Sequence, residues 1–175
     1  RGMISRGVME EMEARGWSYI LGARPRSSKE IREKVITDSG PFDIVEMERV
    51  GKKEPLALEI KEVVVKSEES ETQGESQRRY IVCRNPAQAR RDAASREAMI
   101  EDLGKKLKSG SKSLVGNRGY RRYIEVRGEG FGIDFGKVEE EEKFDGVWIL
   151  RTNASLSSAE AARQYKRLWQ VEQVF

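Results

Sequence analysis

The chain has 175 residues, 36% of them charged and 37% hydrophobic, with a formal net charge of +3 and no histidine. The lack of histidine excludes a Ser-His-Asp triad, a Cys-His pair and a His-ligated zinc site, so a metal held by this chain must have oxygen ligands, which Mg²⁺ and Mn²⁺ prefer. The apolar runs are too short to cross a membrane, and the small excess of basic residues permits a nucleic-acid partner without requiring one.

The first two elements are predicted to be a helix and a buried strand. Ser5–Arg15 carries apolar side chains at helical spacing, and Gly16 is suited to end a helix. The short apolar run Trp17–Ala23 that follows is typical of a strand. Because a helix followed by a strand occurs in many folds, this pair alone does not identify one.

The middle of the chain, Arg24–Lys143, is predicted to be mostly β with one long helix. Its apolar patterns predict a helix at Lys29–Ile36, strands at Phe42–Val50, Pro55–Lys66 and Arg79–Cys83, a helix at Ala87–Lys108, and strands at Gly119–Val126 and Phe131–Phe135. Two acidic segments, Ser67–Gln77 and Glu139–Glu142, are expected to be exposed to solvent.

Arg121 and Arg122 stand between Tyr120 and Tyr123 in the strand predicted at Gly119–Val126. Aromatic rings interleaved with Arg can stack on bases and pair with phosphates, so these two Arg are candidate DNA-binding residues. Charged side chains also protect the edge strand of a sheet from pairing with other chains. This alternative explains the pattern equally well.

The last segment, Phe144–Phe175, is predicted to be a strand followed by an amphipathic helix. Asp145-Gly146 is a turn pair, Val147–Leu150 is a compact apolar run, and Ser157-x-x-Glu160 is a capping box that starts a helix. Glu172 falls in the middle of the apolar arc of that helix. A carboxylate there must be neutralised, paired, hydrogen-bonded or bound to a metal, unless it reaches round to water from a frayed helix end.

Tyr165 and Glu172, seven residues apart, resemble the C-terminal signature of DDE (Asp-Asp-Glu) insertion-sequence transposases, in which Tyr, Arg, Glu and Lys follow at fixed spacing. In that family the Glu is the third metal-binding carboxylate of a ribonuclease-H-like active site. Here Leu168 stands at the Arg position with Arg167 beside it, and the position of the Lys lies beyond the sequence. The preceding run Phe144–Asn153 also resembles the strand that leads into this helix in the family.

The other end of the chain supports the resemblance. Arg1-Gly2-Met3-Ile4-Ser5 resembles the segment that follows the second catalytic Asp of the family. That Asp would stand directly before Arg1 and the first Asp further upstream, so neither would be in this sequence. Since the sequence starts without Met and stops within a predicted helix, we expect it to be a piece of a longer polypeptide.

The resemblance implies an α/β fold with a partial ribonuclease-H-like mixed sheet. Residues 1–23 and 144–175 would belong to the catalytic core, and residues 24–143 would be a mostly β insertion carrying one long helix. The strands Trp17–Ala23 and Val147–Thr152 would then be neighbours in one sheet, because each adjoins a motif of the same active site.

The function implied by the resemblance is metal-dependent cutting and joining of transposon-end DNA. Double-stranded DNA would be the partner, Mg²⁺ or Mn²⁺ the cofactor, and a homodimer would form in the synaptic complex. Glu172 would be the catalytic metal ligand, and Tyr165 would help to position the DNA backbone. With one of three carboxylates present, we expect this chain alone to be inactive. Two alternatives are a DNA-binding remnant of a transposase without catalysis and an unrelated α+β domain with a chance match.

The sequence also predicts where the protein resides. Its one cysteine, Cys83, forms no disulfide within the chain, and no signal peptide is visible. We therefore expect a cytoplasmic protein that does not associate with membranes.

Overall fold

The computed structural model of the chain describes residues 6–48, 55–66, 77–108, 118–127 and 130–172, except the side chains of residues 6, 118 and 168–172. Residues 67–76 of the predicted acidic segment Ser67–Gln77 thus lie outside the described residues. The chain divides into two compact units, which are described separately. Unit 1 comprises Arg1–Asn85 and Val147–Phe175, and unit 2 comprises Pro86–Gly146. No helix in the described parts is both long enough and apolar enough to cross a membrane.

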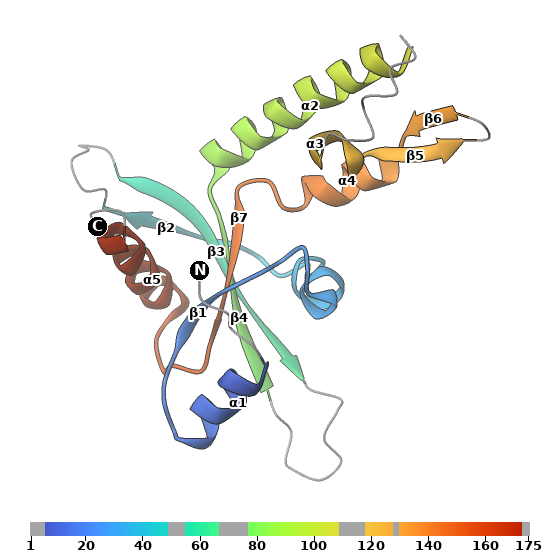
Figure 1. The fold of residues 1–175 in the computed structure, drawn as a ribbon. Helices are drawn as coiled ribbons and strands as arrows, with labels where there is room; N and C mark the ends of the chain where they lie inside the picture. Colours follow the sequence, from blue (N-terminus) through green and yellow to red (C-terminus); the bar gives the residue numbers. More distant parts are fainter. Residues whose placement is uncertain (1–5, 49–54, 67–76, 109–117, 128–129, 173–175) are drawn as a thin grey trace. The chain divides into compact units, whose positions relative to one another are not determined.

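Unit 1 is built on a five-stranded sheet in the order β1-β7-β4-β3-β2 (Figure 1). Its strands are β1 (Ile20–Ala23), β2 (Asp43–Met47), β3 (Leu56–Lys66), β4 (Gln77–Arg84) and β7 (Val147–Thr152). β1 pairs with β7 antiparallel, with Ile20 opposite Thr152, although well over a hundred residues separate them. The prediction that these two segments are neighbours in one sheet is therefore confirmed.

The described strand pairs of this sheet are all antiparallel, whereas the resemblance implies a mixed sheet. β2, β3 and β4 follow one another along the chain and lie side by side, and strands that are joined in this way run antiparallel. β7 lies between β1 and β4 and is antiparallel to both. The described chain is therefore a mixture of helices and strands with an antiparallel sheet. The strands β2–β4, from the segment predicted as an insertion, share this sheet with β1 and β7.

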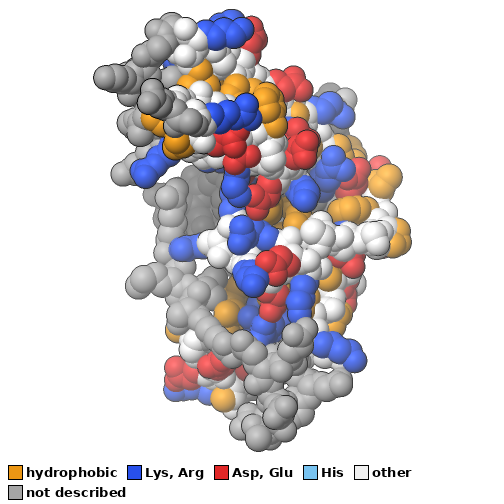
Figure 2. Space-filling model, turned by 90° about the vertical axis from the view of Figure 1, so that its right-hand side faces the viewer, with side chains coloured by type: hydrophobic (Ala, Val, Ile, Leu, Met, Phe, Trp, Pro, Cys, Tyr) orange, Lys and Arg blue, Asp and Glu red, His pale blue; other side chains and the backbone are white. Residues whose placement is uncertain are grey.

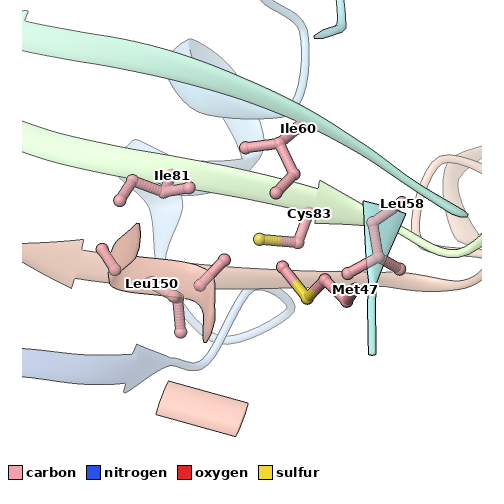
Figure 3. Packing of buried hydrophobic residues seen from close by; sticks show 8 residues of the cluster. Met47, Leu58, Ile60, Ile81, Cys83 and Leu150 are labelled. Carbon is pink, nitrogen blue, oxygen red and sulfur yellow. The ribbon is translucent and has the colours of Figure 1, made fainter. Parts of the chain in front are cut away.

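Alternating side chains give the sheet two apolar faces, each covered by a helix. Helix α5 (Ser158–Glu172) places Ala161 and Ala162 on one face, which is formed by Met47, Leu58, Ile60, Ile81, Cys83 and Leu150 (Figure 3). The π-helix η1 (Ile31–Val35), within the predicted helix Lys29–Ile36, covers the other face, which includes Val63, Val65, Tyr80, Val82 and Ile149. Both faces of β4 and β7 are covered, and each strand accordingly contains a continuous apolar run, Tyr80–Cys83 in β4 and Val147–Leu150 in β7.

The first helix and strand are close to their predicted bounds. Helix α1 (Arg6–Ala14) is terminated by Gly16, as predicted: φ of Gly16 is +69°, and the N–H groups of Gly16 and Trp17 donate to carbonyls of the last helical turn. β1 begins three residues later than predicted. The N–H group of Tyr19 donates to the side chain of Asn153 (2.8 Å) instead of to a neighbouring strand.

Unit 2 packs a hairpin and short helices against one long helix. Its elements are α2 (Pro86–Lys108), α3 (Arg118–Arg121), β5 (Ile124–Arg127), β6 (Gly130–Ile133) and α4 (Phe135–Glu142). Leu103 of α2 and Tyr123 form its buried core. α2 confirms the predicted long helix.

Two parts of unit 2 differ from the prediction. Residues 118–121 form a helical turn and not the start of a strand, because Tyr120 and Tyr123 both pack around Leu103, and a spacing of three residues brings side chains to one side of a helical turn. The predicted strand Phe131–Phe135 ends at Ile133, and an unpredicted helix, α4, follows it. Asp134 caps α4 by accepting a hydrogen bond from the N–H group of Lys137 (2.9 Å).

Candidate functional site

Tyr165 of α5 lies against β1, the strand that follows the N-terminal motif. It packs on the sheet face that α5 covers. Its hydroxyl lies over Gly22, where an added Cβ atom would collide with the hydroxyl oxygen and lie 3.1 Å from Cζ. A glycine at this position therefore makes the contact possible. Through it, the Tyr of the C-terminal motif meets the N-terminal part of the chain.

Helix α5 begins with the predicted capping box. The N–H group of Ser157 donates to the Glu160 carboxylate (2.9 Å), and the N–H group of Glu160 donates to Ser157 Oγ (3.3 Å). Two N–H groups at the start of the helix are thereby satisfied by local side chains. The capping box fixes the residue at which α5 begins and hence which side chains face the sheet.

Arg79 of β4, which the sequence analysis does not single out, holds the loop between β7 and α5. Its guanidinium donates to the carbonyls of Ala154 (2.9 Å) and Leu156 (2.7 Å) and to the Glu62 carboxylate (2.7 Å). Glu62 also accepts a hydrogen bond from Ser158 Oγ (2.7 Å), and the Arg79 guanidinium lowers the pKa of the Glu62 carboxyl. Because hydrogen bonds to charged groups are stronger than neutral ones, this network positions the start of α5. A strand Arg belongs to no motif, so the sequence carries no signal for this role.

The junction between β1 and β7 is held by two further side chains that the sequence analysis does not single out. Asn153 accepts a hydrogen bond from the Tyr19 N–H group (2.8 Å) and donates one to the Trp17 carbonyl (2.9 Å). Thr152 Oγ1 donates to the Tyr19 carbonyl (2.6 Å). These bonds continue the pairing of the two segments beyond the end of β1 and satisfy its backbone groups.

A hollow of about 390 Å³ opens beside Tyr165 within unit 1. It is lined by Gly22, Ala23, Leu56, Asn85, Trp148, Ile149, Tyr165 and Lys166. Its walls are mostly apolar, and the lining residues with polar side chains are Asn85, Tyr165 and Lys166. Tyr165 is half-buried in this position. The predicted DNA-positioning residue therefore borders a recess with a cationic side chain next to it.

Glu172 is the last residue of α5, and its side chain lies outside the described residues. Seven residues are nearly two turns of an α-helix, so positions 165 and 172 share one side of α5, about 10 Å apart along its axis. The described side chains contain no group of three His, Cys, Asp or Glu that could hold a metal ion. The role of Glu172 as a metal ligand stays a prediction.

Arg121 and Arg122 belong to unit 2, whereas Tyr165 belongs to unit 1. Both Arg side chains are exposed at the end of α3. Arg122 forms an ion pair with Glu141 (3.1 Å) and lies over the ring of Tyr123 (5.6 Å to the ring centre). Residues 118–121 are helical and β5 begins at Ile124, so the prediction that a strand begins at Gly119 is wrong. Whether the two Arg bind DNA stays a prediction.

Cys83 is the one thiol of the chain, and it is fully buried on the α5 face of the sheet. Burial raises the pKa of this thiol to about 12, so it is neutral and unreactive at physiological pH. Among the described side chains of unit 1, Cys83 is thus part of the core and not a thiol nucleophile, and the polar groups described above hold the β7–α5 segment in place.

In comparisons with known proteins, no protein-family model, no curated protein and no solved structure matches this chain.

Proposed function

We propose that the chain is part of the catalytic domain of a DDE transposase, which cuts and joins transposon-end DNA by metal-dependent phosphoryl transfer. The observation that carries the proposal is the pairing of two strands, each of which adjoins one of the end motifs. β1, which follows the N-terminal motif, pairs with β7, which leads into the Glu-bearing helix α5. Tyr165 of α5 then contacts Gly22 of β1. Two motifs that belong to one active site require their adjoining segments to be neighbours in the fold. Two motifs that match by chance do not require this.

In this proposal the residues of the chain have distinct roles. Glu172 contributes one carboxylate oxygen ligand, and the other two carboxylates come from Asp residues upstream of Arg1. A bound Mg²⁺ or Mn²⁺ would activate the attacking oxygen and stabilise the leaving oxygen of the phosphodiester. Tyr165 holds the DNA backbone near the reacting phosphate, and Arg79 holds the loop from which α5 begins.

A second candidate function is a DNA-binding remnant that keeps the scaffold but has no catalytic activity. The replacement of the signature Arg by Leu168 favours this alternative. The two functions differ in what stands upstream. An intact enzyme requires an Asp directly before Arg1 and a second Asp further upstream, whereas a remnant does not.

The experiment that tests the proposal uses the longer polypeptide encoded by the parent reading frame. Mn²⁺-dependent nicking of transposon-end DNA should be lost in Glu172→Gln, while thermal unfolding stays unchanged. Glu139→Gln, which removes an exposed carboxylate of α4, is the matched control and should nick normally. Unchanged nicking in Glu172→Gln would show that this Glu is an ordinary helix residue. Absence of nicking in the unmodified protein would favour the remnant.

A further inference from the structure

The segment Arg24–Lys34, between β1 and the end of η1, is rich in basic residues. It carries five basic side chains, Arg24, Arg26, Lys29, Arg32 and Lys34, and two acidic ones, Glu30 and Glu33. We call it the cationic segment. Figure 2 views unit 1 from the side that η1 covers, and Lys and Arg side chains gather near the middle of this view, with carboxylates among them.

One of the two carboxylates in the cationic segment points inward. Glu30 accepts a hydrogen bond from the Tyr80 hydroxyl (2.6 Å) and forms an ion pair with Arg78, both on β4. Its side chain is only 21% exposed. The negative charge of Glu30 is therefore neutralised within the protein, and it does little to offset the basic side chains on the outer surface.

The basic side chains on the outer surface are Arg24, Arg26, Lys29 and Lys34, which are all exposed. Within the described residues Arg24 forms no ion pair, and Lys29 is 4.0 Å from Glu33, its neighbour one helical turn away. An exposed pair at this distance is weak and is screened by salt. With four exposed basic side chains and Glu33 as the exposed acidic one, the outer surface of the segment has a net positive charge.

The backbone of the cationic segment is held in one conformation by the fold. Ile31 and Val35 are buried against the sheet, with exposed fractions of 2% and 0%. Ser28 Oγ accepts a hydrogen bond from the Ile31 N–H group (3.4 Å), at the start of the helical turns. A charged surface on a fixed backbone loses less conformational entropy on binding than a charged tail does.

The segment begins at the recess that contains Tyr165. Ala23, the residue directly before Arg24, lines that recess together with Tyr165 and Lys166. Arg24 is therefore the basic residue of the segment that follows the recess most directly along the chain, at the edge strand β1. Duplex DNA carries a phosphate charge about every 3.4 Å along each strand, so it presents several phosphates to a run of basic side chains.

We propose that the cationic segment binds the phosphate backbone of duplex DNA, with Arg24 and Arg26 as the principal contacts. This inference rests on the proposed function, because DNA bound at Tyr165 is what the segment would extend. Binding through phosphates carries no base specificity, so the contact should strengthen and orient binding to any duplex.

The test titrates this 175-residue chain into a labelled duplex of random sequence, about 20 base pairs long, and measures fluorescence anisotropy. The duplex has about two helical turns and is long enough for several phosphate contacts. Arg24→Gln/Arg26→Gln should weaken binding about tenfold at about 50 mM salt. Loss of two phosphate contacts should also reduce the further weakening between about 50 and 200 mM salt by roughly tenfold. Arg24→Lys/Arg26→Lys keeps both charges and should retain most of the affinity.

The matched control is Lys105→Gln/Lys108→Gln, which removes the same charge from exposed positions of α2. If the control weakens binding as much as the Arg24/Arg26 pair does, net charge explains the effect and the inference is wrong. A chain that binds no duplex DNA also overturns it. Neither outcome decides the catalytic proposal, which depends on metal-dependent nicking and on Glu172.

Discussion

The contact between Gly22 and Tyr165 predicts an unusual response to a small substitution. In a strand, Ala is normally better than Gly, by about 0.5–1 kcal/mol, because Gly loses more conformational freedom on folding. At position 22, however, the added Cβ would collide with the Tyr165 hydroxyl and lie 3.1 Å from Cζ. Inserting a group into a filled space costs about 1–3 kcal/mol. We therefore expect Gly22→Ala to destabilise unit 1 by about 1–2 kcal/mol.

The partner substitution shows whether the Tyr165 hydroxyl is the cause. Tyr165→Phe removes the colliding oxygen, so Gly22→Ala should cost less in the Phe background, with a coupling energy of about 1 kcal/mol. Some loss should remain because of the 3.1 Å contact with Cζ. The control is Gly7→Ala in α1, where an added Cβ has no atom within 4 Å and a helical Ala is favoured by about 0.5–1 kcal/mol.

The assay is urea unfolding followed by a signal from unit 1. With a denaturant slope of about 2 kcal/mol per molar, a loss of 1.5 kcal/mol lowers the midpoint by roughly 0.7 M. Gly7→Ala should leave the midpoint unchanged or raise it. The reasoning is refuted if Gly22→Ala is as stable as the unmodified protein, or if Tyr165→Phe leaves its cost unchanged, because α5 would then not lie on β1 as described.

Two further predictions concern the insertion of unit 2 and the network at Glu62. Deleting Pro86–Asp145 joins Asn85 to Gly146 between the paired strands β4 and β7 and creates an Asn-Gly hairpin loop. Unit 1 should therefore still fold, as measured by circular dichroism and cooperative unfolding. An unfolded product would contradict this prediction. Arg79 lowers the pKa of the Glu62 carboxyl in the folded protein. The ionised carboxylate therefore stabilises the fold at pH values above the unfolded-state pKa of about 4.3. This stabilisation is lost as the pH falls through the lower pKa of the folded state. Glu62→Gln should therefore be less stable than the unmodified protein at pH 7 and equal to it at the lowest pH; a constant difference would exclude this linkage.

Strand β7 and the start of α5 could be predicted because both depend on local patterns, whereas the pairing of β1 with β7 was expected only from the resemblance. Val147–Leu150 is apolar throughout, and only a strand covered on both faces buries every side chain of such a run. Ser157 and Glu160 form the capping box that their spacing predicts. These features follow from neighbouring residues, so the sequence is sufficient to predict them.

The contacts that hold the site together could not be predicted in the same way. Arg79 and Glu62 come from neighbouring strands, and Arg79 also donates to carbonyls of a third segment, so their roles follow from strand register. The motif Tyr-Arg-Arg-Tyr was wrongly assigned to a strand, since alternation and a three-residue helical spacing cannot be distinguished over so few residues. There, packing of Tyr120 and Tyr123 around Leu103 decides the structure.

The way in which unit 2 closes on itself has a consequence for the order of folding. β4 and β7 pair directly, but about 60 residues lie between them, and closing a loop of that length costs conformational entropy. Within unit 2, Arg96 forms an ion pair with Asp145 (2.5 Å), and Asp92 accepts a hydrogen bond from the Gly146 N–H group (2.8 Å). If unit 2 folds first, these bonds bring the end of the segment next to its beginning and shorten the remaining loop to about ten residues. Because the entropic cost of closing a loop grows with the logarithm of its length, this lowers the cost by roughly 1.5 kcal/mol. β4 and β7 would then pair at a cost close to that of two strands joined by a short loop.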